Sequence, residues 1–352
     1  MHPIQSIGYP VHFQNSLEEI KNFISGDNYS KVFVLVDTNT EKHCLPLIKP
    51  YLPKDYDIIE IDPGEENKNI DFCIGVWKML LDFGAERNSL LINLGGGVIT
   101  DMGGFAASTF KRGIDFVQVP TTLLSQVDAS VGGKTGIDMD HVKNIIGTFT
   151  QPKAVFIETG FLKTLDESQL VSGYAEMIKH GLIADKAYFD QLKVADPLHI
   201  EVEAVYRSVE IKNEVVTADP FEKGRRKTLN FGHTIGHAVE TCSLTKKTNP
   251  LLHGEAIAVG MICEAWLSHK VNSLSADELQ EITAVITAKF PRSMISGNNA
   301  ELLAVMHNDK KNEQQRIGFA LLNKIGACDF NIFIDEDLII ESLEYYRNLI
   351  NP

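Results

Sequence analysis

The sequence predicts an α/β domain with a parallel sheet over residues 1–159, followed by a mostly α-helical domain over residues 160–352. Three observations support this fold class. Short apolar segments alternate with helical patterns in the first half, long helical periods dominate the second half, and a run of glycines follows one of the short segments. The chain has 352 residues, of which 44% are hydrophobic, and this is sufficient for two domains.

Five segments of the first half are predicted to be buried strands because they are short, rich in Val and Ile, and end in polar residues or glycine. They are KVFVLVD (31–37), YDIIEID (56–62), SLLINLG (89–95), DFVQVP (115–120) and KAVFIET (153–159). Between the second and third, residues 69–84 are apolar at helical spacing. This alternation favours a parallel sheet covered on both faces, which binds ligands at the carboxyl ends of its strands.

The second half contains four long segments with helical periodicity. They are residues 167–184, 197–216, 254–271 and 275–290. The last segment opens with Ser275 and has Glu278 three positions later, which is a capping-box pattern. Residues 316–334 are predicted to form a hairpin, and a terminal helix is predicted from Glu336.

Composition excludes several classes of protein. The formal net charge of −14 argues against a broad basic face for nucleic acid, so cations for an anionic ligand must be concentrated locally, as in KGRRK (223–227). The N-terminal segment lacks the pattern of a signal peptide, and no apolar run reaches the length of a membrane span. The odd number of cysteines and the lack of a CxxC motif argue against a disulfide framework, so we expect a protein of the reducing cytoplasm. The five cysteines are scattered along the chain: Cys44, Cys73, Cys242, Cys263 and Cys328.

A glycine turn, Gly95 to Gly97, lies between a predicted strand and a predicted helix. Glycines allow the backbone to approach a phosphate, and the following helix N-terminus offers free N–H groups to it. The strict GxGxxG motif is not met because Thr100 stands at the third glycine position. A dinucleotide site and a plain tight turn both remain open, while DPGEENK (62–68) reads by itself as a polar turn.

The segment 119–147 is too rich in small and polar residues to be only packing. The tetrapeptide from Gly132 to Thr135 looks like the end of a P-loop, but Asp128 occupies the position of the first glycine, so we reject a Walker A motif. A glycine-shaped loop that presents Lys134 to an anion and a solvated surface loop are both compatible with the pattern.

The candidate metal ligands are one glutamate and four histidines in the second half. Enzymatic zinc sites commonly use three N or O ligands and leave one position open. The segment GYAEMIKHG places Glu176, Lys179 and His180 on one helix face, and three further histidines follow in two segments: His233, His237 and His253. No glutamate follows the first histidine of the GHTIGH segment, so HExxH does not match. Spacing alone leaves the choice of ligands open.

Together these motifs resemble the 3-dehydroquinate synthase family of sugar-phosphate cyclases. The resemblance covers roughly residues 60–325 and rests on segments in family order: GEENK, GGGVITDMGGFAASTFKRG, QVPTTLLSQVDASVGGKTGID, KNIIGTF, FLKTL, SGYAEMIKHG, LNFGHTIGHAVE, LLHGEA and NDKKN. It implies a Rossmann-like N-terminal domain, a helical C-terminal domain, bound NAD, a catalytic zinc for which cobalt often substitutes, and a homodimer. One departure is Asp138, where the family usually has Asn, and this would weaken the hydrogen bonds of that loop.

The resemblance also implies the roles of individual residues. The metal ligands would be Glu176, His233 and His253, with His237 directed toward the substrate phosphate. The residues implied for NAD are Gly64, Glu65, Lys68, Gly95, Gly96, Gly97, Val98, Asp101, Thr121, Thr122, Lys134, Lys143, Phe161, Leu162, Lys163 and Thr164. The residues implied for the substrate are Asp128, Lys134, Asn144, Lys179, Lys212, Glu222, Arg226 and Asn230, with Arg112 reaching the neighbouring subunit's site and Lys310 or Lys311 holding phosphate.

The family's reaction belongs to the shikimate pathway of aromatic amino acid biosynthesis. It converts 3-deoxy-D-arabino-heptulosonate 7-phosphate into 3-dehydroquinate by transient oxidation, phosphate elimination, reduction and an internal aldol step. Arg226 and Lys212 are the expected partners of the substrate carboxylate. Three alternatives are weighed against this function: a metal-dependent polyol dehydrogenase of the glycerol dehydrogenase type, another sugar-phosphate cyclase, and a non-catalytic nucleotide-binding protein. The last has no reason to keep the three metal candidates together.

Overall fold

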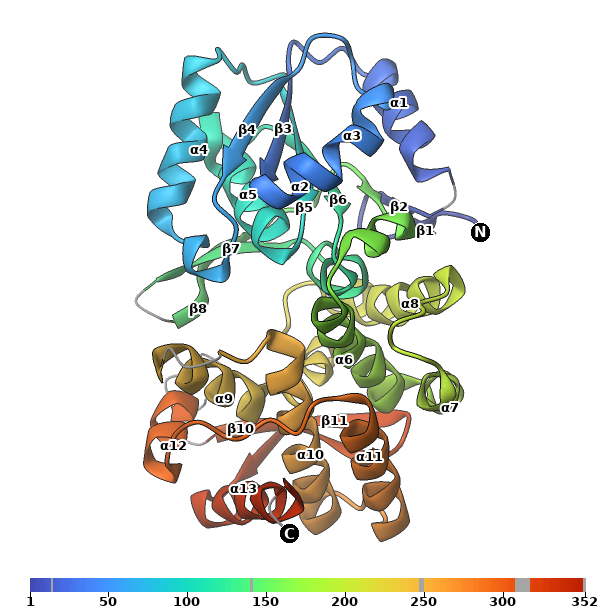
Figure 1. Ribbon diagram of the computed structural model, residues 1–352, viewed down its shortest axis with the longest axis vertical. Helices are drawn as coiled ribbons and strands as arrows, with labels where there is room; N and C mark the ends of the chain where they lie inside the picture. Colours follow the sequence, from blue (N-terminus) through green and yellow to red (C-terminus); the bar gives the residue numbers. More distant parts are fainter. Residues whose placement is uncertain (14, 140–141, 247–249, 308–316, 351–352) are drawn as a thin grey trace. The chain divides into compact units, whose positions relative to one another are not determined.

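The computed structural model describes all residues except 14, 140–141, 247–249, 308–316 and 351–352, and it divides into two compact units, Met1–Asp166 and Glu167–Pro352 (Figure 1). The fold class is confirmed: a sheet of mainly parallel strands forms the first unit, and helices dominate the second. The change of sequence rhythm was placed at residue 160, whereas the two units divide between Asp166 and Glu167.

The first unit is built on a seven-stranded sheet with the order β1-β2-β9-β6-β5-β3-β4. Only the pair β1 and β2 is antiparallel. The strands are β1 (Ile4–Gln5), β2 (Pro10–His12), β3 (Val32–Asp37), β4 (Asp57–Ile61), β5 (Leu90–Gly95), β6 (Asp115–Pro120) and β9 (Val155–Phe156). The strand order reverses between β3 and β5, and ligands of parallel sheets bind outside the carboxyl ends of the strands at such a point.

Helical segments connect these strands. The α-helices are α1 (Ser16–Gly26), α2 (Thr38–His43), α3 (Leu45–Ile48), α4 (Ile70–Asp82) and α5 (Gly97–Thr109). Shorter helical turns are η1 (Lys49–Tyr51), η2 (Glu65–Asn67), η3 (Phe110–Arg112), η4 (Ser125–Ala129, a π-helix) and η5 (Thr159–Thr164). Asn69 caps α4 by accepting hydrogen bonds from the first helical N–H groups, which is why the helix begins there.

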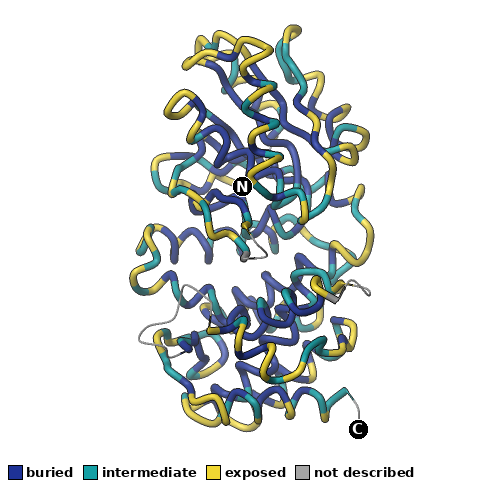
Figure 2. Tube along the Cα trace, turned by 90° about the vertical axis from the view of Figure 1, so that its left-hand side faces the viewer, coloured by how far each residue is buried: buried dark blue, intermediate teal, exposed yellow. Residues whose placement is uncertain are grey.

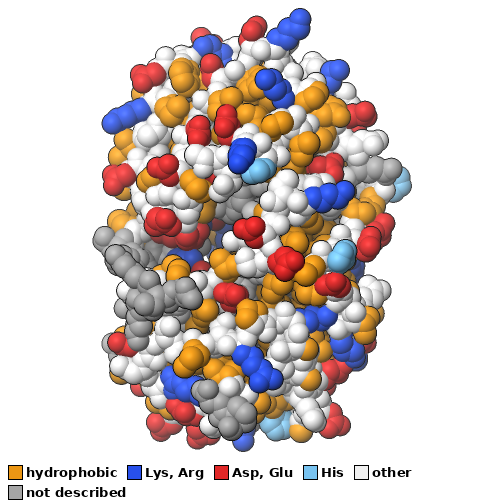
Figure 3. All heavy atoms as spheres, in the orientation of Figure 1, with side chains coloured by type: hydrophobic (Ala, Val, Ile, Leu, Met, Phe, Trp, Pro, Cys, Tyr) orange, Lys and Arg blue, Asp and Glu red, His pale blue; other side chains and the backbone are white. Residues whose placement is uncertain are grey.

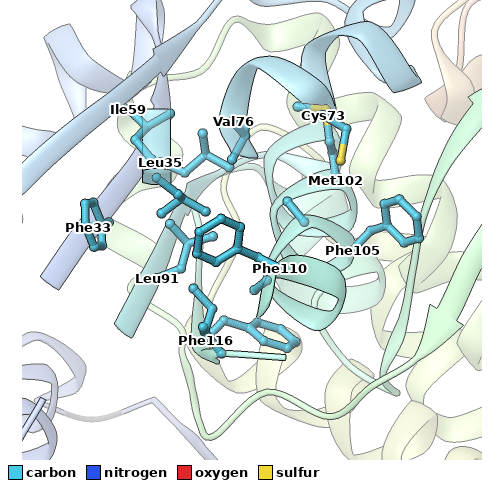
Figure 4. Close-up of a cluster of buried hydrophobic side chains, with 14 of the residues drawn as sticks. Phe33, Leu35, Ile59, Cys73, Val76, Leu91, Met102, Phe105, Phe110 and Phe116 are labelled. Atoms are coloured by element: carbon cyan, nitrogen blue, oxygen red, sulfur yellow. The ribbon is translucent and has the colours of Figure 1, made fainter. Parts of the chain in front are cut away.

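Alternate residues of the strands are buried on opposite faces of the sheet. Phe33 and Leu35 pack with Met102 and Phe105 of α5 in one cluster (Figure 4). Val34 packs on the other face with residues of α1 and α3 in a second cluster. Because both faces are covered, the strands read as continuous apolar runs, as the sequence predicted. Burial of each such side chain contributes about 1.5–3 kcal/mol.

Two predictions for the first unit differ from the structure. The predicted strand 153–159 is a strand only over Val155–Phe156. The segment interpreted as a glycine-shaped loop contains an antiparallel hairpin, β7 (Lys134–Met139) and β8 (Val142–Phe149). Residues 140–141, which lie between the two strands in the sequence, are outside the described residues, and the strands carry too few alternating apolar residues to be recognised from sequence.

The second unit is mostly helical. Its helices are α6 (Glu167–Ala184), α7 (Lys186–Val194), α8 (Val202–Ala218), η6 (Arg225–Asn230), α9 (His233–Lys246), α10 (His253–Val271), α11 (Ala276–Lys289), α12 (Asn299–His307) and α13 (Glu336–Ile350). The predicted hairpin is present as β10 (Ile317–Lys324) and β11 (Ala327–Ile334). The predicted capping box of Ser275 and Glu278 is also present. The predicted helix from residue 197 begins only at Val202.

Helix α10 is the centre of the second unit. It packs against α6, α9, α11, α13 and β10. It is buried along most of its length, and such buried segments run through the interior of the unit (Figure 2). A helix that is apolar on all sides is stable only when other elements surround it. The residues at its N-terminal end are therefore held firmly in place.

The surface of the described residues shows no concentration of positive charge on the face drawn in Figure 3, where Lys and Arg side chains are scattered among Asp and Glu side chains. None of the helices in the described part of the chain is both long and apolar enough to cross a membrane.

Candidate active site

Three side chains from three helices converge in the second unit. Glu176 lies in the middle of α6, His233 is the first residue of α9, and His253 is the first residue of α10. Nε2 of His233 lies 3.4 Å from Oε1 of Glu176, and Nε2 of His253 lies 3.5 Å from the same oxygen. One ligand atom from each residue lies within 4.8 Å of the other two. The structure therefore brings together the three residues that the sequence resemblance selected.

These distances fit a shared metal ion. Two ligand atoms that lie 2.0–2.1 Å from zinc at the tetrahedral angle are about 3.3–3.4 Å apart. Both carboxylate oxygens of Glu176 are buried and accept no hydrogen bond in the described part of the chain. A buried carboxylate without hydrogen bonds is costly unless a cation balances it. Lys179 forms an ion pair with Glu176, and a metal ion would satisfy the remaining acceptor capacity.

The ring nitrogens that face away from Glu176 have partners of their own. Nδ1 of His233 lies 3.0 Å from the carbonyl oxygen of Phe231. Because a carbonyl oxygen only accepts, Nδ1 must donate, and Nε2 is left with a free electron pair for a metal. Nδ1 of His253 lies 3.3 Å from Oε2 of Glu240. Such outer partners fix the orientation of histidine ligands and raise their basicity.

The electrostatic environment shifts the pKa values of all three residues. Burial alone would raise the pKa of Glu176, but Lys179 and His233 outweigh it and hold that pKa well below its ordinary value. Burial, reinforced by Lys179, lowers the pKa of His233. Burial would also lower the pKa of His253, but the carboxylates of Glu240 and Glu176 raise it to about 9.

His237 lies beside the cluster, one helical turn after His233. The centroid of its ring is 5.1 Å from that of His233 and 5.9 Å from that of His253. Its side chain is only partly buried, whereas that of His233 is buried. His237 is therefore placed to meet a ligand next to the metal candidates. The other helix-face residue, His180, is buried and contacts Oγ of Ser208 through Nδ1 at 2.7 Å.

The predicted substrate residues Glu222, Arg226 and Asn230 share one turn between α8 and α9. The carboxylate of Asp219 shapes this turn, because it accepts hydrogen bonds from the backbone N–H groups of Lys223, Gly224 and Arg226 at 2.7–3.0 Å. The side chain of Asn230 donates to Oε1 of Glu222 at 3.0 Å.

Two cations of the predicted substrate set are buried in this unit. The side chain of Arg226 is buried, and its Nη1 donates to the carbonyl oxygen of Pro220 at 2.7 Å. Lys212 on α8 is buried as well, as is Lys179 on α6. Lys179 is balanced by its ion pair with Glu176. The guanidinium group of Arg226 has the planar shape that matches a carboxylate.

In the first unit, the predicted cofactor residues collect at the carboxyl edge of the sheet. Gly95 ends β5, and Gly97 is the first residue of α5, with Val98 following it. Thr121 and Thr122 follow β6, and the backbone N–H of Thr121 donates to the carbonyl of Gly95 at 3.0 Å. The stretch from Phe161 to Thr164 lies in η5 after β9. Phe161 itself packs in the core, so only its backbone is available to a ligand.

A polar cluster around Lys68 lies in the same unit. Its Nζ lies 2.5 Å from Oδ2 of Asp101 and 2.6 Å from Oδ1 of Asn144. Burial would lower the pKa of Lys68, but Asp101 and further carboxylates raise it. Asp138 accepts a hydrogen bond from the backbone N–H of Asn144 at 2.7 Å, so the expected weakening of this loop is not seen at that bond. Lys143 pairs with Oε1 of Glu65 at 3.2 Å, next to Gly64.

The remaining predicted residues lie in other elements or outside the described residues. Asp128 is in η4, Lys134 is the exposed first residue of β7, and Arg112 is exposed at the end of η3. Lys310 and Lys311 lie outside the described residues. Seven non-glycine residues of the described chain have a positive φ, and three of them, Arg112, Asn144 and Glu222, are predicted site residues. Strained backbone of this kind is concentrated at functional sites.

Comparison with known proteins decides the family. Sequence models of the N-terminal and C-terminal parts of 3-dehydroquinate synthase match residues 58–172 and 173–312. A 3-dehydroquinate synthase of Parabacteroides distasonis is 44% identical over 94% of this chain and 95% of its own length. The chain belongs to the 3-dehydroquinate synthase family. A relative from Clostridium botulinum with the same name is 42% identical over 84% of this chain and 86% of its own length.

Solved structures place the fold of this 3-dehydroquinate synthase family member among the sugar-phosphate cyclases. A 2-deoxy-scyllo-inosose synthase in complex with carbaglucose-6-phosphate, NAD+ and Co2+ has a TM-score of 0.86 at 23% identity and covers 98% of this chain and 100% of its own. The 2-epi-5-epi-valiolone synthase of Streptomyces hygroscopicus, with NAD+ and Zn2+, has a TM-score of 0.84 at 25% identity and covers 99% of both chains. A probable glycerol dehydrogenase of Sinorhizobium meliloti, which covers 97% of this chain and 96% of its own, reaches a TM-score of only 0.63 at 13% identity.

Sequence reasoning missed two residues that shape the site in this 3-dehydroquinate synthase family member. Asp219 organises the substrate turn, and an aspartate directly after a helix and before Pro and Gly is a recognisable turn signal. Glu240 contacts His253 across 13 positions of sequence. No local pattern indicates that pairing, because it depends on how α9 and α10 pack.

Proposed function

We propose that the protein acts as a 3-dehydroquinate synthase, a carbon–oxygen lyase that converts 3-deoxy-D-arabino-heptulosonate 7-phosphate into 3-dehydroquinate and phosphate. The observation that carries this proposal is the convergence of Glu176, His233 and His253 in a chain that is 44% identical to a family member. The buried cations of the same unit support it, because the substrate carries a carboxylate and a phosphate.

We infer that Glu176, His233 and His253 hold a zinc or cobalt ion. Related cyclases contain Co2+ or Zn2+, and the spacing of the ligand atoms in this chain suits either ion. When bound, such an ion polarises a substrate hydroxyl and stabilises the negative charge that develops on its oxygen. The chain contributes the fixed ligand positions, and Lys179 balances the charge of Glu176.

We infer that the carboxyl edge of the sheet in the first unit holds NAD, which supplies a reversible hydride acceptor when bound. The glycine turn at β5 exposes backbone N–H groups at the N-terminus of α5, where a pyrophosphate is stabilised. Lys68 and Lys143 provide cations in the same unit, and Asp101 and Glu65 hold these two lysines in place.

For the substrate, we propose that Arg226 binds the carboxylate with its guanidinium group and that Lys212 adds a second charge. The pair of Glu222 and Asn230 would hold substrate hydroxyls, because a carboxylate accepts hydrogen bonds and an amide both accepts and donates them. His237 would position the phosphate next to the metal ligands, and Lys134 of the first unit is proposed for the same group. Most of the chain's contribution is orientation and charge stabilisation.

Three further substrate residues keep their proposed roles. Asp128 and Asn144 belong to the first unit, and Arg112 is proposed to reach a second copy of the chain in a homodimer. The exposed apolar side chains of Ile145 and Phe149 in β8 support a contact with a second copy. For the location, we propose a reducing cytoplasm, which the free state of all five cysteines supports.

The test is an assay that contains the heptulosonate phosphate, NAD and zinc and follows three products together. We expect inorganic phosphate and dehydroquinate to appear in equal amounts, without net NADH, because the cofactor is regenerated in each turnover. NADH release from polyols without phosphate release would instead identify a dehydrogenase of the glycerol dehydrogenase type. Release of phosphate with a different cyclic product would identify another cyclase.

A further inference from the structure

Glu264 of α10 is a buried acid whose carboxylate lies against the beginning of α9. It is fully buried among apolar residues, which is rare for glutamate unless specific partners hold it. Oε2 accepts a hydrogen bond from the backbone N–H of Gly232 at 2.6 Å, and Oε1 accepts one from the backbone N–H of Ile235 at 3.0 Å. One carboxylate thus binds the backbone on both sides of His233.

These two bonds are the ones that a helix normally makes for itself. In a capping box, the side chain of the N-cap residue accepts from the third helical N–H, and the side chain of the third residue accepts from the N–H of the N-cap. Here α9 begins at His233, so Gly232 holds the cap position and Ile235 is the third residue. Neither residue has a polar side chain, and Glu264 makes both bonds from another helix.

No residue with a capping side chain can replace glycine at position 232. Its φ is +80°, which disfavours residues other than glycine, and a Cβ atom at this position would lie 2.6 Å from Cγ of Met261 and 3.2 Å from its backbone nitrogen. The close approach of α10 therefore excludes a capping side chain at position 232. The close packing of α10 also brings Glu264 within hydrogen-bonding distance of the start of α9. Helix α10 therefore both excludes a capping side chain at position 232 and supplies the carboxylate that caps α9.

A single peptide group connects Glu264 to the imidazole of His233. The N–H of Gly232 and the carbonyl of Phe231 belong to the same peptide unit. The N–H donates to Glu264, and the carbonyl accepts from Nδ1 of His233 at 3.0 Å. A negative charge on the N–H side polarises this peptide and makes its carbonyl a stronger acceptor. The stronger acceptor holds the proton on Nδ1 and leaves Nε2 directed toward Glu176, 3.4 Å away.

We propose that Glu264 is a positioning residue for the metal centre, which acts through the Phe231–Gly232 peptide to fix the ring orientation and tautomer of His233. The proposal rests on the proposed metal site and extends it by a residue that touches neither ion nor substrate. Glu240 contacts Nδ1 of His253 directly. Each of the two proposed histidine ligands is therefore oriented by a carboxylate, His253 by direct contact and His233 through a peptide group.

The test compares Glu264→Gln with a matched control, Glu278→Gln. Glu278 also caps a helix of the second unit, accepting from the backbone N–H groups of Ile325 at 2.9 Å and Ser275 at 3.1 Å, but it has no bond to the segment around His233. Glutamine at position 264 keeps the size of the side chain, loses the charge, and replaces one acceptor by an NH2 group that faces an N–H donor. Zn2+ affinity of the full-length protein is measured by competition with a chromophoric chelator.

We expect Glu264→Gln to raise the Kd for Zn2+ about 10- to 100-fold, and to change the visible absorption spectrum of bound Co2+. We expect Glu278→Gln to lower the melting temperature without changing either metal readout. An unchanged Kd and Co2+ spectrum in Glu264→Gln would overturn the proposal while sparing the metal site. Failure of the wild-type protein to bind Zn2+ would refute the metal site itself.

A second measurement does not depend on the folding of any Glu264 variant. Histidine labelled with 15N in metal-free wild-type protein reports which ring nitrogen carries the proton at neutral pH. We expect His233 to be protonated at Nδ1. Its ring 15N signals are assigned as those that are missing from the spectrum of the His233→Gln variant. A predominant Nε2–H form of His233 would show that the peptide group does not fix the tautomer, and the proposal would fail.

Discussion

The substitution Gly260→Ala tests whether the metal ligands depend on the close packing of α9 against α10. A Cβ atom at position 260 would lie 1.9 Å from the carbonyl oxygen of Gly232 and 2.7 Å from the backbone nitrogen of Gly236. Both contacts are with backbone, so no side-chain rotation relieves them. Ordinary contact begins at 3.4 Å, so α10 and the start of α9 must move apart by about 1.5 Å at this point.

A shift of this size has two expected consequences. Overpacking of a well-packed interior costs about 1–3 kcal/mol, and a contact between two backbones belongs at the upper end of this range. Because His233 directly follows Gly232, its Nε2 is displaced from its present position 3.4 Å from Oε1 of Glu176. Displacement of about 1 Å reduces catalysis roughly 100-fold in typical enzymes.

The assay measures bound zinc per chain, kcat/KM and the free energy of unfolding for Gly260→Ala. Gly75→Ala in α4 is the stability control, because a Cβ atom there has no neighbour within 4 Å. We expect the control to be neutral or up to about 1 kcal/mol more stable, since alanine favours a helix over glycine. Full zinc content and wild-type kcat/KM in Gly260→Ala would refute the claim that this helix contact positions His233.

Three further predictions concern single side chains. His237→Ala should retain the full metal content, because its ring lies beside the cluster without being one of its three ligands, but it should lose most of its turnover; unchanged turnover would remove His237 from the phosphate site. Arg226→Lys should raise KM at least about 10-fold while the fold is retained, because an ammonium group lacks the planar fork that matches a carboxylate, and steady-state kinetics on the heptulosonate phosphate would reveal an unchanged KM if the assignment is wrong. Asp219→Asn should destabilise the protein by about 1 kcal/mol near neutral pH, because an amide nitrogen would face backbone N–H donors. Burial would raise the pKa of Asp219, but the three backbone N–H groups and Arg226 hold this pKa below its ordinary value. The stabilisation by the carboxylate is therefore present above about pH 4 and is lost as the pH falls through the lower pKa of the folded state. The stabilities of wild type and variant should converge in that pH range, and a constant difference at all pH values would contradict the reasoning.

Much of the fold was accessible from the sequence because it depends on local periodicity. The strands around Val34 and Ile92 were predicted from continuous apolar runs, and α6, α10 and α11 from helical spacing. The hairpin of β7 and β8 was not predicted, because its stability comes from pairing across Gly136 and Gly147 rather than from a strong local pattern. The start of α8 was placed five residues early, since helix boundaries depend on capping and burial as much as on periodicity.

In the candidate site, the difference between what the sequence predicts and what only the structure shows is larger. The residue types at Glu176, His233, His237 and His253 were sufficient to suggest a metal, but their spacing left the ligand set open until the family resemblance narrowed it. The structure adds what no spacing contains: which nitrogen of each ring faces Glu176, and which groups hold the other nitrogen.

The sequence by itself thus determined most of the strands of the main sheet, the long helices, the chemical types of the site and the family, because these depend on short segments of neighbouring residues. Only the tertiary structure decided that Glu240 contacts His253 and that Glu264 binds the backbone next to His233. Glu264 and Gly232 are 32 positions apart, and their contact exists because α9 and α10 pack closely enough to exclude a side chain at position 232. A hydrogen bond of this kind depends on the distance between two backbones, and that distance is set by the packing of the whole unit.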